Sequence, residues 1–420
     1  MKFFKISLFL LFVNLVLQVH AQISPFVGGS NFPYLHPTPG KISIMAMSPV
    51  TTGITPTREL YQNISDCGFN LVTQQGNLDF YKQQFNLIGD LDLKFIISNN
   101  LLGREGEDWF TNNLKDSPYV AGWLLIDEPK FEILNEVNSR YQRLLSLDSD
   151  KLVLVNLVGM ISQPFTGNYK NLQGYYNYIQ KLLKPGVWSY DYYPILIKDG
   201  KLIIEYDTFY SDFEIFRNMA QKTRRPFWAF CESMEYTTKW YSRPAANEAY
   251  LRFEAFSALA YGAQGIVYWT YGMRPSNDTE KYISALVEVK GNKTQAWFAA
   301  QKVNREIIKF NDIFYNCTVV NVRHTGAKLY KNTKRLSGSF GPFSMVRTED
   351  SGVLISDIRS KGKNYIVIVS HDVQEPQKIT LELSANGKIK DLTSKTLKEY
   401  SGIQDISFIL DKGGVLIFEY

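Results

Sequence analysis

Eight short segments rich in β-branched and aromatic residues recur between residues 42 and 270, and stretches long enough to form a helix separate them. Such segments are typical of buried β-strands. Eight repeats of strand and helix favour a closed parallel barrel, because an open doubly wound sheet usually has five or six strands and a Gly-rich phosphate loop after its first strand. The expected strands are Ile42–Ser48, Asn70–Gln74, Lys94–Ser98, Ala121–Ile126, Lys151–Leu157, Val187–Tyr193, Phe227–Cys231 and Gly265–Thr270.

The segments between the strands include three clear helix patterns. Glu132–Leu147 carries its apolar residues on one face, and Gln295–Phe310 closes the series. Ala245–Tyr261 is preceded by Pro244 and followed by Gly262, which is the usual asymmetry of helix termini. We therefore expect an α/β fold, a (β/α)8 TIM barrel, over residues 22–312.

The pattern changes after residue 312, where short strands follow one another without helices. This is the signature of a β-sandwich. A length of 420 residues also suits one large and one smaller domain. We expect a small C-terminal all-β sandwich domain over residues 313–420, with strands at Thr318–Val322, Val353–Ile358, Tyr365–Ser370, Lys378–Leu383, Ile406–Leu410 and Val415–Tyr420, and with a loop at Lys331–Phe343.

Residues 1–21 have the pattern of a cleaved signal peptide. Lys2 and Lys5 precede an interrupted apolar run that ends at Val19-His20-Ala21. The run is too short to span a bilayer, so we expect a secreted or periplasmic protein without a membrane span. Removal of the two lysines lowers the formal charge from +5 to +3, and the remaining basic residues are scattered, which argues against a nucleic-acid partner.

Cysteine and histidine usage excludes two other classes of site. Cys67, Cys231 and Cys317 are odd in number and widely spaced, which argues against a disulfide framework. The four histidines lie outside the expected strand ends, so we expect no metal site and no cofactor.

Active sites of parallel barrels are built from residues at the C-terminal ends of the strands. Two glutamates occupy such positions: Glu128 follows the fourth strand and Glu232 follows the seventh. Carboxyl groups on these strands face each other across the barrel mouth, where they can approach the separation of about 5 Å that retaining glycosidases use. We expect Glu128 to be the acid/base and Glu232 the nucleophile, with Tyr193 or Tyr271 holding the nucleophile in place.

These residues and their neighbours give the chain a resemblance to glycoside hydrolase clan A, over roughly residues 40–312. The resemblance is carried by Asp127-Glu128-Pro129, Glu232, the aromatic strand Val267–Tyr271 and the preceding Ala258–Gly265. Within the clan it is closest to β-galactosidase-like enzymes of the family 42 type and to secreted bacterial endo-β-glycanases. The clan commonly has Asn before the acid/base, where this chain has Asp127.

Sugar-binding residues are expected around the catalytic pair. We expect Asp127, Asn99, Asn100, Tyr193, Trp269 and Tyr271 to contact the substrate, because sugars stack on aromatic faces and hydrogen-bond to amides and carboxylates. Each has a structural alternative. Asp127-Glu128-Pro129 also suits a charged helix N-terminus, the aromatic residues suit barrel packing, and Asn pairs are common in turns.

The sequence thus predicts a secreted retaining glycoside hydrolase that cleaves β-glycosidic bonds of a poly- or oligosaccharide by double displacement. One alternative is a catalytically inactive glycan-binding protein on the same fold. Another is a structural role, which would be favoured if Leu196–Tyr210 closed the barrel mouth. A carbohydrate is the expected partner, and the sequence leaves the oligomeric state open.

Overall fold

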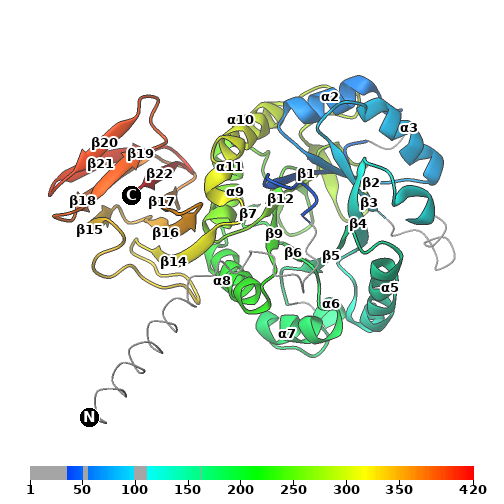
Figure 1. Ribbon diagram of the computed structural model, residues 1–420, viewed down its shortest axis with the longest axis horizontal. Coiled ribbons are helices and arrows are strands. Elements are labelled where there is room, and N and C mark those ends of the chain that lie inside the picture. The colour runs from blue at the N-terminus through cyan, green and yellow to red at the C-terminus, as the bar shows by residue number, and fades with distance from the viewer. Residues whose placement is uncertain (1–35, 51–54, 99–110, 162) are drawn as a thin grey trace, which may run out of the picture.

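The computed structural model describes residues 36–50, 55–98, 111–161 and 163–420. Eight parallel strands form a closed barrel in the order β1-β12-β9-β6-β5-β4-β3-β2 (Figure 1). The predicted (β/α)8 barrel with a C-terminal β domain is confirmed. The barrel strands are β1 (Ser43–Met47), β2 (Leu71–Gln75), β3 (Lys94–Ser98), β4 (Val120–Asp127), β5 (Leu152–Val158), β6 (Trp188–Asp191), β9 (Phe227–Glu232) and β12 (Gly265–Trp269).

Alternation along each strand decides which side chains fill the barrel. In β9, Trp228 and Phe230 point into the barrel, whereas Ala229 and Cys231 pack outward against the helices. The inner core is a small apolar cluster that also receives residues such as Leu154 from β5. Each strand buries one face inward and one outward, as expected for a parallel barrel whose helices cover its outside.

Helices surround the barrel, and four of the described helices begin with a Thr or Asn side chain that caps the first turn. The helices are α2 (Arg58–Asp66), α3 (Leu78–Ile88), α5 (Leu134–Leu147), which follows the 3-10 turn Phe131–Ile133, α6 (Gln163–Thr166), α7 (Leu172–Leu182), α8 (Tyr206–Thr223), α9 (Glu248–Ala260), α10 (Gln295–Lys309) and α11 (Asn311–Phe314). Helix α9 begins later than predicted. Asn247, and not Pro244, caps it, since the Asn247 side chain accepts a hydrogen bond from the Tyr250 amide.

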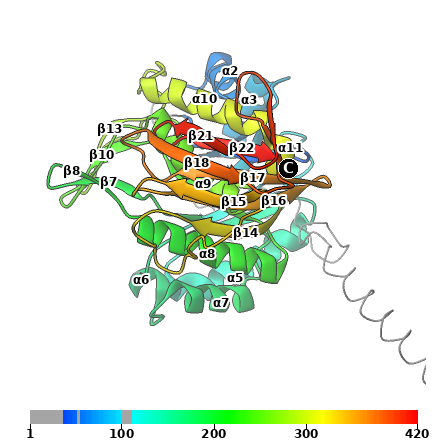
Figure 2. The ribbon, with the colours of Figure 1, turned by 90° about the vertical axis from the view of Figure 1, so that its left-hand side faces the viewer.

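A second sheet, which the sequence pattern did not predict, is built by the segments that follow β6, β9 and β12. Its order is β13-β10-β11-β7-β8, and its strands are β7 (Ile195–Lys198), β8 (Lys201–Ile204), β10 (Glu235–Thr237), β11 (Ser242–Arg243) and β13 (Lys281–Ser284). Because these segments leave the C-terminal ends of barrel strands, we call it the mouth sheet. Figure 2 shows its strands projecting at one end of the molecule.

The C-terminal domain contains two antiparallel sheets, of order β14-β16-β17-β22-β19-β20 and β15-β18-β21. A separate apolar cluster fills the space between them. Strands β15, β19 and β20 were not predicted, because they are short or present many exposed residues. The strands are β14 (Thr318–His324), β15 (Phe343–Thr348), β16 (Val353–Ser360), β17 (Lys363–Ser370), β18 (Gln377–Leu383), β19 (Lys388–Asp391), β20 (Lys398–Ser401), β21 (Asp405–Leu410) and β22 (Val415–Glu419).

The six-stranded sheet packs directly on the barrel helices. Strands β16 and β17 contact α9, which lies behind the sheet in Figure 2. Apolar residues of the sheet, such as Leu354 and Val367, belong to the same core cluster as the outer face of the barrel. Helix α9 is therefore enclosed on both sides, and ten of its residues are buried.

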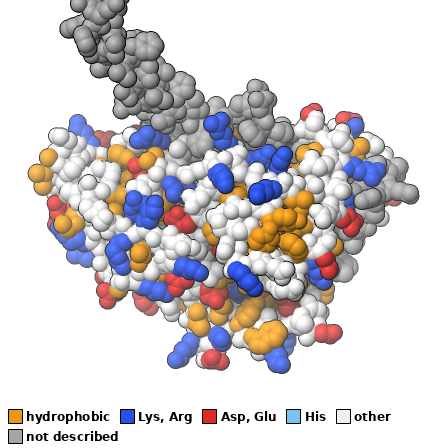
Figure 3. All heavy atoms as spheres, turned by 90° about the horizontal axis from the view of Figure 1, so that it is seen from below, with side chains coloured by type: hydrophobic (Ala, Val, Ile, Leu, Met, Phe, Trp, Pro, Cys, Tyr) orange, Lys and Arg blue, Asp and Glu red, His pale blue; other side chains and the backbone are white. Residues whose placement is uncertain are grey.

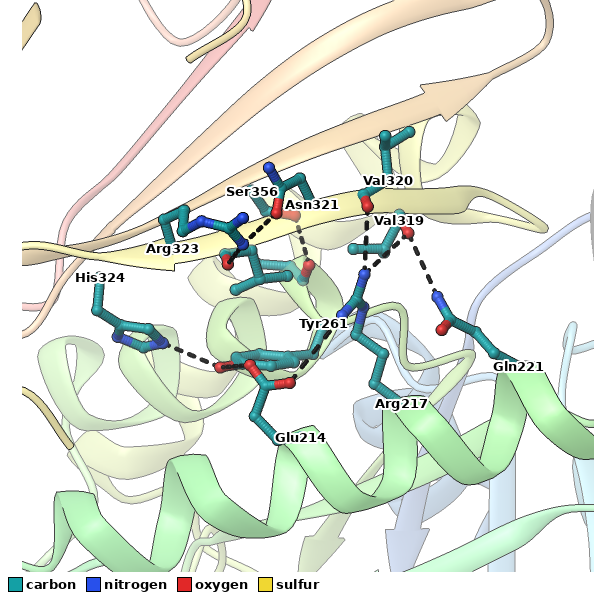
Figure 4. Close-up of polar contacts among 12 residues, drawn as sticks. Glu214, Arg217, Gln221, Tyr261, Val319, Val320, Asn321, Arg323, His324 and Ser356 are labelled. Carbon is teal, nitrogen blue, oxygen red and sulfur yellow. Dashed lines mark hydrogen bonds and ion pairs between the residues drawn. The ribbon is translucent and has the colours of Figure 1, made fainter. Parts of the chain in front are cut away.

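Polar contacts reinforce this contact between α8, α9 and the sheet (Figure 4). Arg217 of α8 donates to the carbonyl oxygens of Val319 and Val320, both at 3.3 Å. The Ser356 hydroxyl donates to the Ala260 carbonyl at 2.7 Å. The sandwich is thus attached to the barrel by hydrogen bonds as well as by apolar packing.

Two buried histidines extend this network from the sheet into the barrel. His324 Nδ1 lies 3.1 Å from His371 Nε2, and His324 Nε2 lies 2.9 Å from the Tyr261 hydroxyl, which donates to Glu214 at 3.1 Å. His371 Nδ1 lies 3.0 Å from the Ser351 carbonyl. All four ring nitrogens therefore have a polar partner.

The remaining features of the described residues concern the surface and the cysteines. Cys67, Cys231 and Cys317 are buried and unpaired. No helix in the described ranges is long and apolar enough to cross a bilayer. On the face drawn in Figure 3, basic and acidic side chains lie interspersed.

Candidate active site

A β-bulge in β4 sets the direction of the residues before Glu128. The pairing of β4 with β5 shifts between Leu124 and Ile126, so that Leu124 points into the barrel and Ile126 packs on its outside. The extra residue reverses the alternation. Asp127 consequently points into the barrel mouth, where it lines a cavity together with Leu124.

Glu128 follows the bulge in an uncommon backbone conformation. Its φ is 43°, a left-handed value that costs free energy for a residue other than glycine, and its amide donates to the Asn156 carbonyl at 3.0 Å. The side chain is partly accessible. Burial and, to a smaller extent, the Asp127 charge raise the pKa of the Glu128 carboxyl to about 7, which is the behaviour required of a general acid.

Asn156 joins two further carboxyls to this corner of the mouth. Its Nδ2 donates to Asp127 Oδ1 at 3.0 Å and to Asp191 Oδ1 at 2.9 Å, while its Oδ1 accepts from the Ser189 hydroxyl at 2.8 Å. Burial raises the pKa of Asp127 and, further, that of Asp191, where the Glu128 and Asp127 charges add to the effect.

Glu232 ends β9 with its two carboxyl oxygens in different surroundings. Oε1 accepts from the Met234 amide at 3.1 Å. Oε2 has no hydrogen-bond partner among the described residues and lies 4.0 Å from Nε of Arg243. Burial raises the pKa of the Glu232 carboxyl well above its ordinary value, and the Arg243 guanidinium and the Met234 amide oppose this effect only in part. Because arginine stays protonated, Arg243 supplies a permanent counter-charge to the ionised form.

Arg243 and Glu254 hold this arrangement from two sides. Arg243 donates from Nη1 to the carbonyl oxygens of Tyr193 at 2.6 Å and Ile195 at 2.8 Å, which fixes the guanidinium in the mouth sheet. Glu254 of α9 accepts from the Glu232 amide at 2.9 Å. The nucleophile candidate is therefore positioned by the mouth sheet in front and by α9 behind.

Aromatic side chains form one wall beside the carboxyls. Trp269 stacks on Tyr193 with ring centroids 5.8 Å apart, and Tyr236 and Tyr282 meet it edge-on at 5.8 and 6.2 Å. The Arg274 guanidinium lies 5.7 Å from the Trp269 ring centroid. Such a wall offers flat apolar faces of the kind on which sugars stack.

A cavity of about 270 Å³ opens at the mouth beside this wall, and Tyr282 and Arg274 border both. It is lined by the ends of β1–β4 and by the segment after β12, including Gln74, Asp127 and Arg274. The Thr73 hydroxyl at this cavity is buried and has no hydrogen-bond partner in the described part of the chain. The cavity includes neither Glu128 nor Glu232, so it extends the site rather than containing the carboxyl pair.

The structure brings together most of the residues expected at the site, but not all of them. Glu128, Asp127, Glu232, Tyr193 and Trp269 lie at the barrel mouth. Tyr271 does not: it is buried between strands and helices, where its hydroxyl accepts from Trp297 Nε1 at 3.0 Å. Alternation from Val267 and Trp269 would direct Tyr271 inward, but β12 ends at Trp269 and its alternation does not extend to Tyr271. Asn99 and Asn100 lie outside the described residues.

Four residues of the site were not among the catalytic and sugar-binding residues expected from the sequence. Asp191 and Asn156 have the inward register that alternation predicts, so sequence reasoning could have included them. Arg243 lies on a two-residue strand of the mouth sheet and Glu254 on a buried helix, and no local pattern marks either. In the described ranges no group of three His, Cys, Asp or Glu side chains is arranged to hold a metal ion.

Comparison with known proteins adds an independent finding. Residues 134–310 match the family model described as beta-galactosidase, Glyco_hydro_42. The matched segment includes Glu232 and Trp269 and begins after Glu128. No curated protein matches the chain.

Several solved structures of glycoside hydrolases share the fold of this chain. A catalytic mutant of Gan42B, a GH42 β-galactosidase from G. stearothermophilus, has a TM-score of 0.57 at 10% identity, over 90% of this chain and 98% of that chain. The β-galactosidase from Bacillus circulans sp. alkalophilus has a TM-score of 0.58 at 10% identity, over 93% and 99%. A glycoside hydrolase family 5 protein from Bacteroides vulgatus has a TM-score of 0.53 at 10% identity, over 90% and 88%. The chain covers 60% of the β-galactosidase from Marinomonas ef1.

Proposed function

We propose that this protein is a glycoside hydrolase that cleaves β-glycosidic bonds with net retention of configuration, using Glu128 as acid/base and Glu232 as nucleophile. The observation that carries the proposal is the contrast between the two carboxyls. Glu128 is partly accessible with a pKa of about 7, whereas Glu232 has one oxygen fixed by Met234 and the other directed toward Arg243. One group suits proton donation and the other suits attack.

The reaction follows in two displacements. In the first, Glu232 Oε2 bonds to the anomeric carbon while the glycosidic C–O bond breaks and Glu128 gives its proton to the leaving oxygen. In the second, ionised Glu128 removes a proton from water, whose oxygen bonds to the anomeric carbon as the Glu232 ester bond breaks. Two inversions at one carbon give net retention, and Glu128 ends protonated again.

The substrate we propose is a β-linked oligo- or polysaccharide, with β-galactosides as the first class to test because the matched family model is described as beta-galactosidase. Trp269 and Tyr193 supply a stacking wall next to the carboxyls. Trp240, which is 71% exposed at the turn between β10 and β11, supplies a second aromatic face on the mouth sheet. A chain longer than two sugars could contact both.

The decisive experiment is hydrolysis of a panel of aryl β-glycosides, followed by ¹H NMR of the first sugar product. We expect release from at least one glycoside, and the β-anomer as the first product. Initial appearance of the α-anomer would exclude the double displacement, because an inverting enzyme attacks with water directly.

Variants assign the two roles. Glu232→Ala removes the nucleophile, and added azide should then form the α-glycosyl azide. Glu128→Ala keeps the nucleophile, so a glycoside with a good leaving group should still form the glycosyl-enzyme, which azide converts to the β-glycosyl azide. Glycan binding without release by the wild type or either variant would move the protein to the glycan-binding class.

Export is part of the same proposal and is supported by the pattern of residues 1–21 alone. We propose that the protein acts outside the cytoplasm after cleavage behind Ala21. Expression in a secreting host, followed by N-terminal sequencing of protein from the periplasm or medium, tests this: a chain that begins at Gln22 is expected, and an uncleaved cytoplasmic chain would refute it.

A further inference from the structure

The cavity beside the aromatic wall has the size of one sugar unit. Its volume of about 270 Å³ lies just below the roughly 300–1,000 Å³ of sites that hold drug-sized ligands. Its lining extends from the exposed Arg274 to Leu124, which belongs to the inner core of the barrel. The cavity therefore leads inward from the mouth and reaches the apolar core.

The inner part of the cavity carries a hydroxyl group that no described residue uses. Thr73 follows Leu71 on the inward face of β2, lines the cavity and is 2% exposed. Its Oγ1 has no hydrogen-bond partner in the described part of the chain. An unpaired buried hydroxyl costs free energy, and such groups in folded proteins commonly pair with an ordered water or a ligand. The cavity thus has hydrogen-bonding capacity that the fold itself leaves unused.

Arg274 is the one cationic side chain among the described residues of the lining, and two aromatic rings hold it there. Its guanidinium lies 5.7 Å from the ring centroid of Trp269 and 5.9 Å from that of Tyr282. Over the described ranges it forms neither an ion pair nor a hydrogen bond, whereas Arg243 donates to two carbonyl oxygens and faces Glu232. Because Arg274 is exposed, a ligand in the cavity can reach its N–H groups.

Asp127 is the other charged residue of the described lining, and it belongs to a different side of the barrel. Arg274 follows β12 and Asp127 ends β4, while β1, β2 and β3 lie between these two strands in the barrel order. The Asn156 amide already donates to Oδ1 of Asp127. Burial raises the pKa of Asp127 and so lowers its negative charge at a given pH, although the Arg274 charge opposes this effect. The cavity therefore has a cationic end at Arg274 and a less charged, hydrogen-bonding end at Asp127.

We propose that this cavity binds the glycone of the substrate and selects an acidic sugar, a β-linked uronic acid whose carboxylate pairs with Arg274. The inference rests on the proposed function of the mouth as a glycosidase site. A guanidinium binds a carboxylate through two parallel hydrogen bonds, which gives both affinity and orientation. The glycone occupies the cavity because the cavity leads inward, whereas a leaving group needs a path to solvent. Thr73 and Asp127 then contact hydroxyl groups of the same sugar.

The first test compares pairs of aryl glycosides that differ only at C6 of the sugar: a β-galacturonide with a β-galactoside, and a β-glucuronide with a β-glucoside. In at least one pair, kcat/KM should be about 10- to 100-fold higher for the uronide, the range expected for one charge-assisted pair. The corresponding 6-sulfates form a third arm, because a sulfate ester also carries negative charge. Equal or lower kcat/KM for both uronides, or a preference for the sulfates over the uronides, would overturn the proposal.

Variants assign the preference to Arg274. Arg274→Met keeps an unbranched side chain beside Trp269 but removes the charge, so the ratio of kcat/KM for uronide and neutral glycoside should fall 10- to 100-fold. Lys281→Gln is the matched control, because Lys281 is an exposed cation of β13 next to Tyr282 but does not line the cavity. The ratio should stay unchanged in this control. An equal fall in both variants would show that the preference reflects the general charge of the mouth and would overturn the pairing.

A binding measurement needs no catalysis. By calorimetry or ligand-observed NMR, the wild type should bind free galacturonate or glucuronate at least tenfold more tightly than galactose or glucose. Thr73→Val keeps the shape of the side chain and removes its unpaired hydroxyl, so the uronate should bind more weakly while the free energy of unfolding stays equal or rises. Uronate binding that is unchanged in both Arg274→Met and Thr73→Val would overturn the site. If the wild type bound the uronate selectively but hydrolysed no glycoside, the proposed function would fail while the acidic-sugar site stood.

Discussion

The proposed role of the Glu128 carboxyl as general acid predicts how activity depends on pH. Its pKa of about 7, raised mainly by burial, means that the protonated form required for departure of the leaving group is lost above that pH. We expect kcat/KM for a glycoside with a poor leaving group to fall about tenfold per pH unit above pH ~7.5. A glycoside whose leaving group needs no proton should lack this limb. If kcat/KM fell above the same pH with both substrates, the assignment of Glu128 as general acid would be contradicted.

The Arg243 guanidinium is the counter-charge of Glu232, and its removal should lower activity strongly. Arg243→Met leaves a buried carboxylate without a cation, a loss of about 3–5 kcal/mol for such pairs, so we expect kcat/KM to fall at least 100-fold. The acidic limb should also move to higher pH, because loss of the cation raises the Glu232 pKa. Arg243→Lys, which keeps the charge, is the control. An unchanged acidic limb in Arg243→Met would refute the role.

Individual residues also show where sequence reasoning succeeds. Strand alternation places Glu232 and Trp269 inward from the sequence alone. It fails for Asp127, which simple alternation would direct outward and which the bulge in β4 turns into the mouth. A bulge depends on the pairing with β5, so no window of local sequence contains it. The sequence analysis expected Tyr271 at the mouth, but β12 ends at Trp269, so the strand alternation does not hold for Tyr271.

At the scale of single elements, the turn between β10 and β11 carries the most exposed described tryptophan. The Thr238 hydroxyl accepts from the amides of Trp240 and Tyr241, which makes this turn rigid and fixes Trp240 outward. We expect Trp240→Ala to raise KM for long β-glycans about 2- to 10-fold, the range for loss of one aromatic contact. Aryl monoglycosides should be unaffected. If Trp240→Ala left KM for long β-glycans unchanged, a glycan contact at Trp240 would be excluded.

The barrel strands could be predicted from sequence and the mouth sheet could not, for the same physical reason. Barrel strands are buried on both faces and read as long apolar runs. The mouth-sheet strands have only two to four residues. Strand β10 pairs with a segment tens of residues away, as Tyr236 pairs with Tyr282, whereas β7 and β8 form a local hairpin through Asp199-Gly200. The parts that surround Glu232 are thus the ones with the weakest sequence signal.

At the scale of the whole molecule, the buried histidines at the contact between barrel and sandwich make stability depend on pH. Burial lowers the pKa of His371 from 6.5 to about 4 and that of His324 well below 6.5. The unfolded chain binds these protons at higher pH than the folded protein. The stabilisation is therefore complete above pH 6.5 and is lost as pH falls toward 4, by up to about 1.4 kcal/mol per pH unit and histidine.

Urea unfolding between pH 7 and 4.5 measures this dependence. The free energy of unfolding should fall more steeply with acidification in the wild type than in His371→Asn, which keeps polar atoms in place but does not titrate. The exposed Lys363→Gln serves as the control for a change of charge alone. If the free energy of unfolding depended on pH equally in the wild type and in His371→Asn, a contribution from His324 and His371 would be contradicted.

Helix α9 has one face on β9, the strand of the proposed nucleophile Glu232, and the other on the sandwich. Glu254 holds the Glu232 amide, and at the end of the same helix the Ala260 carbonyl is held by Ser356 of β16. A recombination event that replaced the C-terminal domain would therefore have to supply a new surface for this helix at once, or lose the placement of Glu232. The two domains are expected to have been inherited together, and their residues along α9 to have changed in step rather than separately.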